Sequence, residues 1–203
     1  IEFAVDMKDK GEGIFYLLQI RPIVQNKESQ VDNLFQINPE DEILYSNNAL
    51  GHGVFNDVYD IVYVKTKDFN AINNTKIAME IDVINTEFLK QGRNYVLVGP
   101  GRWGSSDPWL GIPVKWSQIS NAQVLVELAL NNYKIEPSQG THFFQNLTSF
   151  GVGYFSVNPY IQNDGLFDEK YLNEQPAINE TEYVRHVHFS EPIIIKINGK
   201  KNI

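Results

Sequence analysis

One stretch of helical spacing, residues 75–91, is followed at once by the apolar run NYVLVGP, and this succession limits the folds open to the chain. Thr75 is suited to cap a helix, and Gly92 stands where that helix would stop. Between them, apolar side chains recur every three or four positions, at Ile77, Ile81, Ile84 and Phe88. The sequence therefore predicts a helix leading directly into a short buried strand.

Further strand-like stretches surround this helix. Before it stand EILYS and DVYDIVYVK, and after it IPVKW, GVGYFSV and the run QVLVELAL, which is ambiguous between strand and helix. GTHFFQNLTSF and DEKYLNE are predicted as further helices, and YVRHVHF and PIIIKING as two strands of a closing hairpin. The expected fold class is α/β or α+β, with a mixed sheet and flanking helices.

Composition excludes several classes of protein. The chain has 203 residues, of which 42% are hydrophobic, so a folded core is expected. It contains no cysteine, which excludes disulfides, thiolate catalysis and Cys-ligated zinc. A net charge of -8, with scattered basic residues, argues against nucleic acid as a partner. No apolar stretch approaches the ~20 residues of a membrane span, so we expect no membrane partner and a cytoplasmic location.

The opening residues predict a β-hairpin whose polar side chains converge. Residues 1–6 and 14–20 are expected to be strands. Gln19 and Arg21 share a face, and Glu2 joins them if the register places it opposite. A carboxylate, an amide and a guanidinium suit a nucleoside triphosphate with magnesium. The alternative is an exposed sheet face with an ordinary Glu–Arg pair, and residue types alone favour it.

The pattern IEFAVD, a turn and FYLLQIRPI resembles the final hairpin of the ATP-grasp domain in the phosphoenolpyruvate synthase and pyruvate phosphate dikinase family. The resemblance implies ATP and Mg²⁺ as cofactors, with Glu2 as a metal ligand, Gln19 supporting the site and Arg21 on the ATP phosphates. It also implies a small-molecule phosphoryl acceptor such as pyruvate. The expected organisation is a truncated ATP-grasp hairpin (1–25), a connector (26–40) and a C-terminal α/β domain (41–203). The remainder of the ATP-grasp domain would then lie in a longer parent protein.

The same family has a carrier domain with a phosphorylatable histidine before a Gly-Ile-Pro element. Here Thr141-His142 follows Gly111-Ile112-Pro113 instead, so no phosphohistidine is assigned and His142 stays a candidate only. The region from GPGRWGSSDPWLGIPV to EPSQGTHFFQNLTSFGVGYF also resembles that of uncharacterised bacterial proteins named after phosphoenolpyruvate synthase. That resemblance implies no activity for the region.

The loop VGPGRWGSSD is a candidate anion site. Gly101 would let backbone N–H groups approach an anion, Arg102 would supply a fork of donors, and Ser105 a hydroxyl. The alternative is a rigid turn in which Trp103 and Trp109 pack over the core. The residues do not separate the two interpretations.

The histidines are weaker candidates. His142, Gln145 and Asn146 fall on one helical face, although a structural role for this stretch is favoured. His186 and His188 share a strand face, but they lack a visible third metal ligand, and a solvated or edge-strand pair is favoured.

Two function classes remain. One is a C-terminal piece of an ATP-dependent phosphotransferase that is inactive in isolation. The other is a non-catalytic module that binds an anion or docks a domain beside an ATP-grasp unit.

Overall fold

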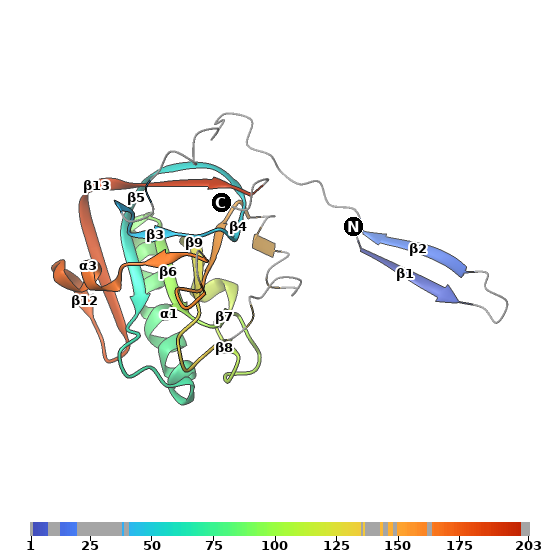
Figure 1. The fold of residues 1–203 in the computed structure, drawn as a ribbon, viewed down its shortest axis with the longest axis horizontal. Coiled ribbons are helices and arrows are strands. Elements are labelled where there is room, and N and C mark those ends of the chain that lie inside the picture. The colour runs from blue at the N-terminus through green and yellow to red at the C-terminus, as the bar shows by residue number, and fades with distance from the viewer. Residues whose placement is uncertain are drawn as a thin grey trace.

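Four inner strands of one sheet run parallel and form the centre of the fold. The computed structural model describes residues 2–7, 13–19, 38, 41–134, 136, 143, 146–147, 150–161 and 164–199. Within them a seven-stranded sheet has the order β12-β13-β5-β6-β9-β10-β4. The parallel strands are β5 (His52–Val64), β6 (Tyr95–Pro100), β9 (Ala122–Leu128) and β10 (Gly153–Val157). The fold is therefore mixed α/β, rich in strand and poor in helix (Figure 1).

Antiparallel strands complete both edges of this sheet. At one edge β4 (Ala49–Leu50) pairs with β10, and at the other β12 (Ala177–Glu180) pairs with β13 (Val184–Asn198), which pairs with β5. Two small sheets join β3 (Leu44–Tyr45) to β11 (Leu166–Phe167) and β7 (Arg102–Trp103) to β8 (Gly111–Ile112).

The predicted helix is present as α1 (Asn74–Gln91), and it packs on one face of the sheet (Figure 1). All four apolar residues of the predicted face are buried. Gly92 ends the helix in the left-handed conformation, at φ 62°, and its N–H bonds back to the last turn. The start is displaced from the prediction, because the helix begins at Asn74 and Thr75 lies exposed within its first turn.

The predicted closing hairpin is wrong. Residues 184–198 form one strand, β13, which pairs along its length with β5 rather than folding on itself. The register shifts between His188 and Ile193, an interval that contains Pro192. Because proline has no N–H to donate to the neighbouring strand, it interrupts the regular pairing at this point. The interruption lies where the sequence predicts the turn of the hairpin.

Two apolar cores lie on opposite faces of the sheet. Ile77, Ile81 and Phe88 of α1 pack against one face, together with Leu97 and Leu125. On the other face, the side chains of Val98, Val126 and Phe155 form a second core, covered in part by Leu172 of the short helix α3 (Glu169–Glu174). Alternation along the strands thus supplies both cores, as in other sheets with both faces covered.

The first two strands stand apart from this sheet. β1 (Glu2–Met7) and β2 (Gly13–Gln19) form an antiparallel hairpin with no strand of the larger sheet bonded to it (Figure 1). The bounds agree with the prediction within one residue at each end. The connector predicted at 26–40 lies outside the described residues, except for Asn38.

Candidate functional site

The hairpin register places Glu2 opposite Gln19. These two residues are Cα partners, and a register shift follows between Glu2 and Phe3. The backbone register thus has Glu2 opposite Gln19, as a shared polar patch requires. Arg21, the third predicted member, lies outside the described residues.

Both faces of the hairpin expose apolar side chains. Phe15 and Leu17 point to one face of β2, and Tyr16 and Leu18 to the other, because side chains alternate along a strand. All four are exposed, with Phe15 at 59% and Leu18 at 61%. Exposed apolar side chains grouped in this way are typical of surfaces that pack against other protein segments.

The glycine loop after β6 uses its backbone donors within the protein. The N–H groups of Gly101, Arg102 and Gly104 bond to the carbonyls of Leu128, Leu110 and Ile112. The space over Gly101 is also taken, since a Cβ there would meet Tyr133 at 2.6 Å. These contacts favour the rigid-turn interpretation over a backbone cradle for an anion.

The side chains of this loop make turn contacts as well. Arg102 Nε donates to the carbonyl of Glu136 at 2.7 Å, and the Ser105 hydroxyl donates to the carbonyl of Asp107. Trp103 is buried in the core, as that interpretation predicts. Trp109 is 62% exposed, so the prediction that it packs over the core is wrong.

A buried carboxylate that the sequence analysis missed anchors the same loop. Glu127, near the end of β9, is 4% exposed. Its Oε1 accepts from the backbone N–H of Trp103 at 3.0 Å, and its Oε2 accepts from the Tyr154 hydroxyl at 2.7 Å, while the indole N–H of Trp103 donates to the carbonyl of Val126. The signal for it was an acid inside the apolar run VLVELAL, because a carboxylate among buried positions needs donors nearby.

His186 and His188 meet a third polar group, Asp60 of β5. His186 Nε2 lies 2.8 Å and His188 Nδ1 2.9 Å from Asp60 Oδ1, while Arg93 Nη2 donates to Oδ2. Asp60 and His186 are buried, and β13 is an inner strand. The predicted solvated or edge-strand pair is therefore wrong for His186.

The charge of Asp60 is stabilised by these partners. Burial opposes ionisation, but the hydrogen bonds from His186, Arg93 and His188 outweigh it and hold the pKa of Asp60 below its ordinary value. The carboxylate ties β13 to β5 and to the residue that follows α1. No group of three or more His, Asp or Glu among the described residues has the arrangement of a metal site.

His142 and Gln145 lie outside the described residues. The hypothesis that His142 is a functional residue therefore stays a prediction. Phe143, next to His142, stacks on Trp116 with ring centroids 4.4 Å apart. This contact agrees with the structural role favoured for that stretch.

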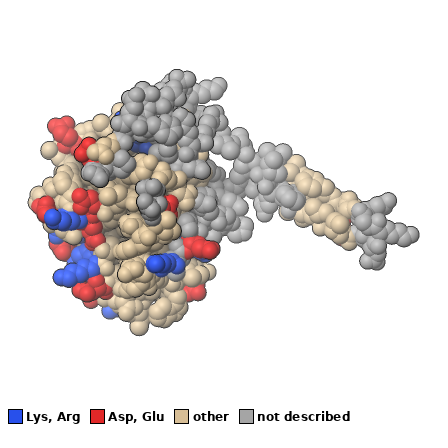
Figure 2. All heavy atoms as spheres, in the orientation of Figure 1, with Lys and Arg blue, Asp and Glu red and all other residues tan. Residues whose placement is uncertain are grey.

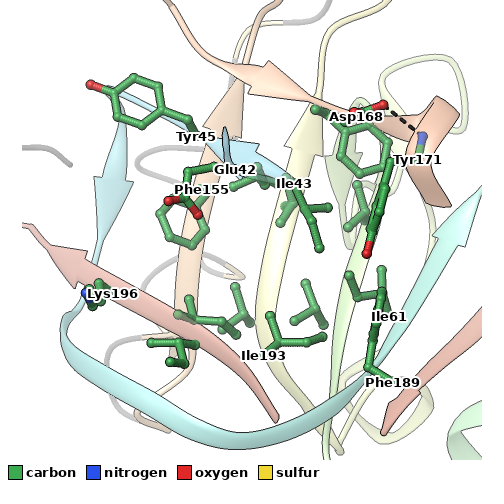
Figure 3. Close-up of a pocket in the computed structure, with 18 of the residues that line it drawn as sticks. Glu42, Ile43, Tyr45, Ile61, Phe155, Asp168, Tyr171, Phe189, Ile193 and Lys196 are labelled. Carbon is green, nitrogen blue, oxygen red and sulfur yellow. Dashed lines mark hydrogen bonds between the residues drawn. The ribbon is translucent and has the colours of Figure 1, made fainter. Parts of the chain in front are cut away.

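The face of the sheet opposite α1 contains a cavity of about 820 Å³. Its floor is made by side chains of the parallel strands, and β3, β11, the start of α3 and the second half of β13 surround it (Figure 3). The lining is mainly apolar and includes Ile43, Ile61, Val98, Phe155 and Ile193. Its volume and mainly apolar lining are in the range found for small-molecule sites. No motif in the sequence predicts it.

On the face drawn in Figure 2, the charged side chains of the described residues are of mixed sign. Figure 2 shows Lys and Arg side chains next to Asp and Glu side chains on the face it presents. Among the described helices, none is long and apolar enough to cross a membrane. The expectation that nucleic acid is not a partner stays a prediction.

No family model, curated protein or solved structure matches this chain.

Proposed function

We propose that the chain is part of an ATP-dependent phosphotransferase of the phosphoenolpyruvate synthase and pyruvate phosphate dikinase type, and that the β1–β2 hairpin forms one wall of its nucleotide site. The observation that carries the proposal is the register of the hairpin, in which Glu2 stands opposite Gln19. A pair set directly across two strands can act on one ligand.

The residue types fit magnesium and ATP. A carboxylate such as that of Glu2 offers the oxygen ligands that Mg²⁺ prefers, and Gln19 adds an amide beside it. Arg21 would hold phosphate oxygens through its guanidinium fork. When bound, Mg²⁺ and these donors would neutralise charge on the transferred phosphoryl group. The resemblance implies a small acceptor such as pyruvate.

The exposed apolar side chains of the hairpin support the proposal that this chain is part of a larger enzyme. A two-stranded hairpin is at best marginally stable without cover, and here the described apolar side chains on both faces are exposed. We propose that the rest of an ATP-grasp domain covers them. The 203-residue chain alone is then not a competent enzyme, because it lacks the other walls of the site.

A second candidate function concerns residues 41–199. The bonded glycine loop disfavours phosphate binding there, whereas the cavity on the sheet face favours a non-catalytic binding module. In this candidate the domain accompanies the ATP site without taking part in phosphoryl transfer.

Labelled ATP separates the two candidates. The protein that contains the complete nucleotide-binding domain is incubated with magnesium and ATP labelled at the β or γ phosphate, and acid-labile phosphate is mapped by mass spectrometry. Label on His142, lost in His142→Ala, makes the C-terminal domain a phosphoryl carrier. ATP consumption that depends on Arg21 but leaves His142 unlabelled supports the binding module. ATP consumption unchanged in Arg21→Ala overturns the proposed role of the hairpin.

A further inference from the structure

The cavity on the sheet face combines an apolar interior with an acidic border. Four acidic residues belong to its lining, Asp41, Glu42, Asp168 and Glu191, and Lys196 is the only basic residue among the described lining. The carboxylates of Asp168 and Asp41 also accept hydrogen bonds, from the backbone N–H of Tyr171 and the side chain of Asn38. Lys196 lies at the end of the cavity away from Tyr171 (Figure 3). The border therefore carries a net negative charge, and the end near Tyr171 has no described basic residue in the lining.

One wall of the cavity is flat and aromatic. The rings of Tyr171 and Phe189 are almost parallel, with 7° between their planes and 6.4 Å between their centroids. Figure 3 shows both rings on the same side of the cavity, one beyond the other. The Tyr171 hydroxyl points into the cavity in this view and makes no hydrogen bond to another described residue.

The floor of the cavity, on the sheet, is aliphatic. Ile61, Val98 and Val126 rise from three neighbouring parallel strands, and Ile193 of β13 closes the lower side. Parallel sheets are normally covered on both faces, and here the cover of the second face leaves about 820 Å³ open. That volume lies within the range of about 300–1,000 Å³ found for small-molecule sites.

We propose that this cavity binds a small amphiphilic cation, a molecule with an apolar or aromatic body and one protonated amine or quaternary ammonium group. The body packs between the aromatic wall and the aliphatic side chains. The positive group lies at the acidic border, where the acidic residues attract it and an exposed ring face of the aromatic wall adds cation–π contact. An anionic ligand of the same shape is repelled by the same border. This inference does not depend on the ATP site of the hairpin.

Three probes of one shape test the charge preference. They are 4-phenylbutylammonium, the neutral 4-phenylbutanol and the anionic 4-phenylbutyrate, each titrated at neutral pH into the isotopically labelled 203-residue chain and followed by NMR. The proposal predicts that the cation binds about fivefold or more tightly than the anion, with the alcohol between them. Equal affinities, or a preference for the anion, would overturn it.

Two variants locate the binding. Ile193→Trp fills the cavity and is expected to weaken all three probes, whereas Ile178→Trp, on an exposed position of β12 outside the lining, leaves them unchanged. The double variant Glu42→Gln and Glu191→Gln is expected to remove the advantage of the cation without weakening the alcohol. The control double variant, Glu87→Gln with Glu182→Gln, removes an equal number of negative charges at positions outside the lining. It is expected to retain the advantage of the cation.

A measurement on the unmodified chain keeps the test decisive if Ile193→Trp does not fold. Chemical shifts caused by the cation are expected to concentrate at residues 41–46, 167–171 and 189–196. Shifts centred elsewhere, or no binding at millimolar probe concentrations, would show that the cavity is not this site.

Discussion

Asp60 is a single carboxylate on which three side chains from distant parts of the chain converge. His186 is 126 residues away in sequence and Arg93 is 33 residues away, so no local pattern links them. The sequence indicates that the two histidines share a strand face, but it does not indicate the carboxylate they contact. The long separation explains this, because the pairing of β5 with β13 creates the contact.

Replacing Asp60 should destabilise the fold. Asp60→Asn removes the negative charge and one of the two acceptor oxygens shared by His186, His188 and Arg93, and the expected loss is about 2 kcal/mol in the free energy of unfolding. Because the pKa of Asp60 is lowered in the folded state, its contribution is complete above the ordinary value of 3.8 and is lost as pH falls below it. Urea unfolding of both proteins should therefore show a difference that shrinks as the pH falls below about 4. A difference independent of pH would contradict this account.

Glu127 is expected to matter more than either of its partners. Glu127→Ala leaves the buried Trp103 N–H and Tyr154 hydroxyl without this acceptor, at an expected cost of about 3 kcal/mol. Tyr154→Phe removes one of these hydrogen bonds and should cost about 1 kcal/mol. Thermal unfolding compares the two variants. If they lose equal stability, the carboxylate does not anchor the glycine loop.

Among the elements, α1 and β6 were the most predictable, since their apolar spacing and the glycine stop are local signals. β13 was not, because Ser190-Glu191-Pro192 resembles a turn and only the distant β5 makes it one strand. The cavity could not be predicted for a similar reason. Its walls come from seven separate segments whose arrangement depends on non-local pairing.

Gly92 provides a direct test of the end of α1. It adopts φ 62°, and an added Cβ would meet no atom within 4 Å, so a substitution acts through backbone conformation alone. Gly92→Ala should cost about 1 kcal/mol, and Gly92→Asn less, because asparagine tolerates the left-handed region. Chemical unfolding measures both. Equal stability of the glycine and alanine proteins would contradict the assigned cap.

At the scale of the whole molecule, the hairpin and the seven-stranded sheet should differ in stability. The hairpin has no described cover, whereas β6 and β9 are buried on both sides. In the 203-residue chain, amide hydrogen exchange should be fast throughout β1 and β2 and slow in β6 and β9. In a protein that contains the covering domain, the hairpin amides should become protected. Strong protection of the hairpin in the chain alone would show that it needs no further protein.

The central claim is that the hairpin contributes to a magnesium–ATP site, and calorimetric titration tests it most directly. Magnesium–ATP is titrated into the protein with the complete nucleotide-binding domain, and into its Glu2→Gln and Arg21→Ala variants. Asp6→Asn, an exposed carboxylate of the same strand, is the control. The account predicts about tenfold or greater loss of affinity in the first two variants and none in the control. Unchanged binding in both Glu2→Gln and Arg21→Ala would contradict it.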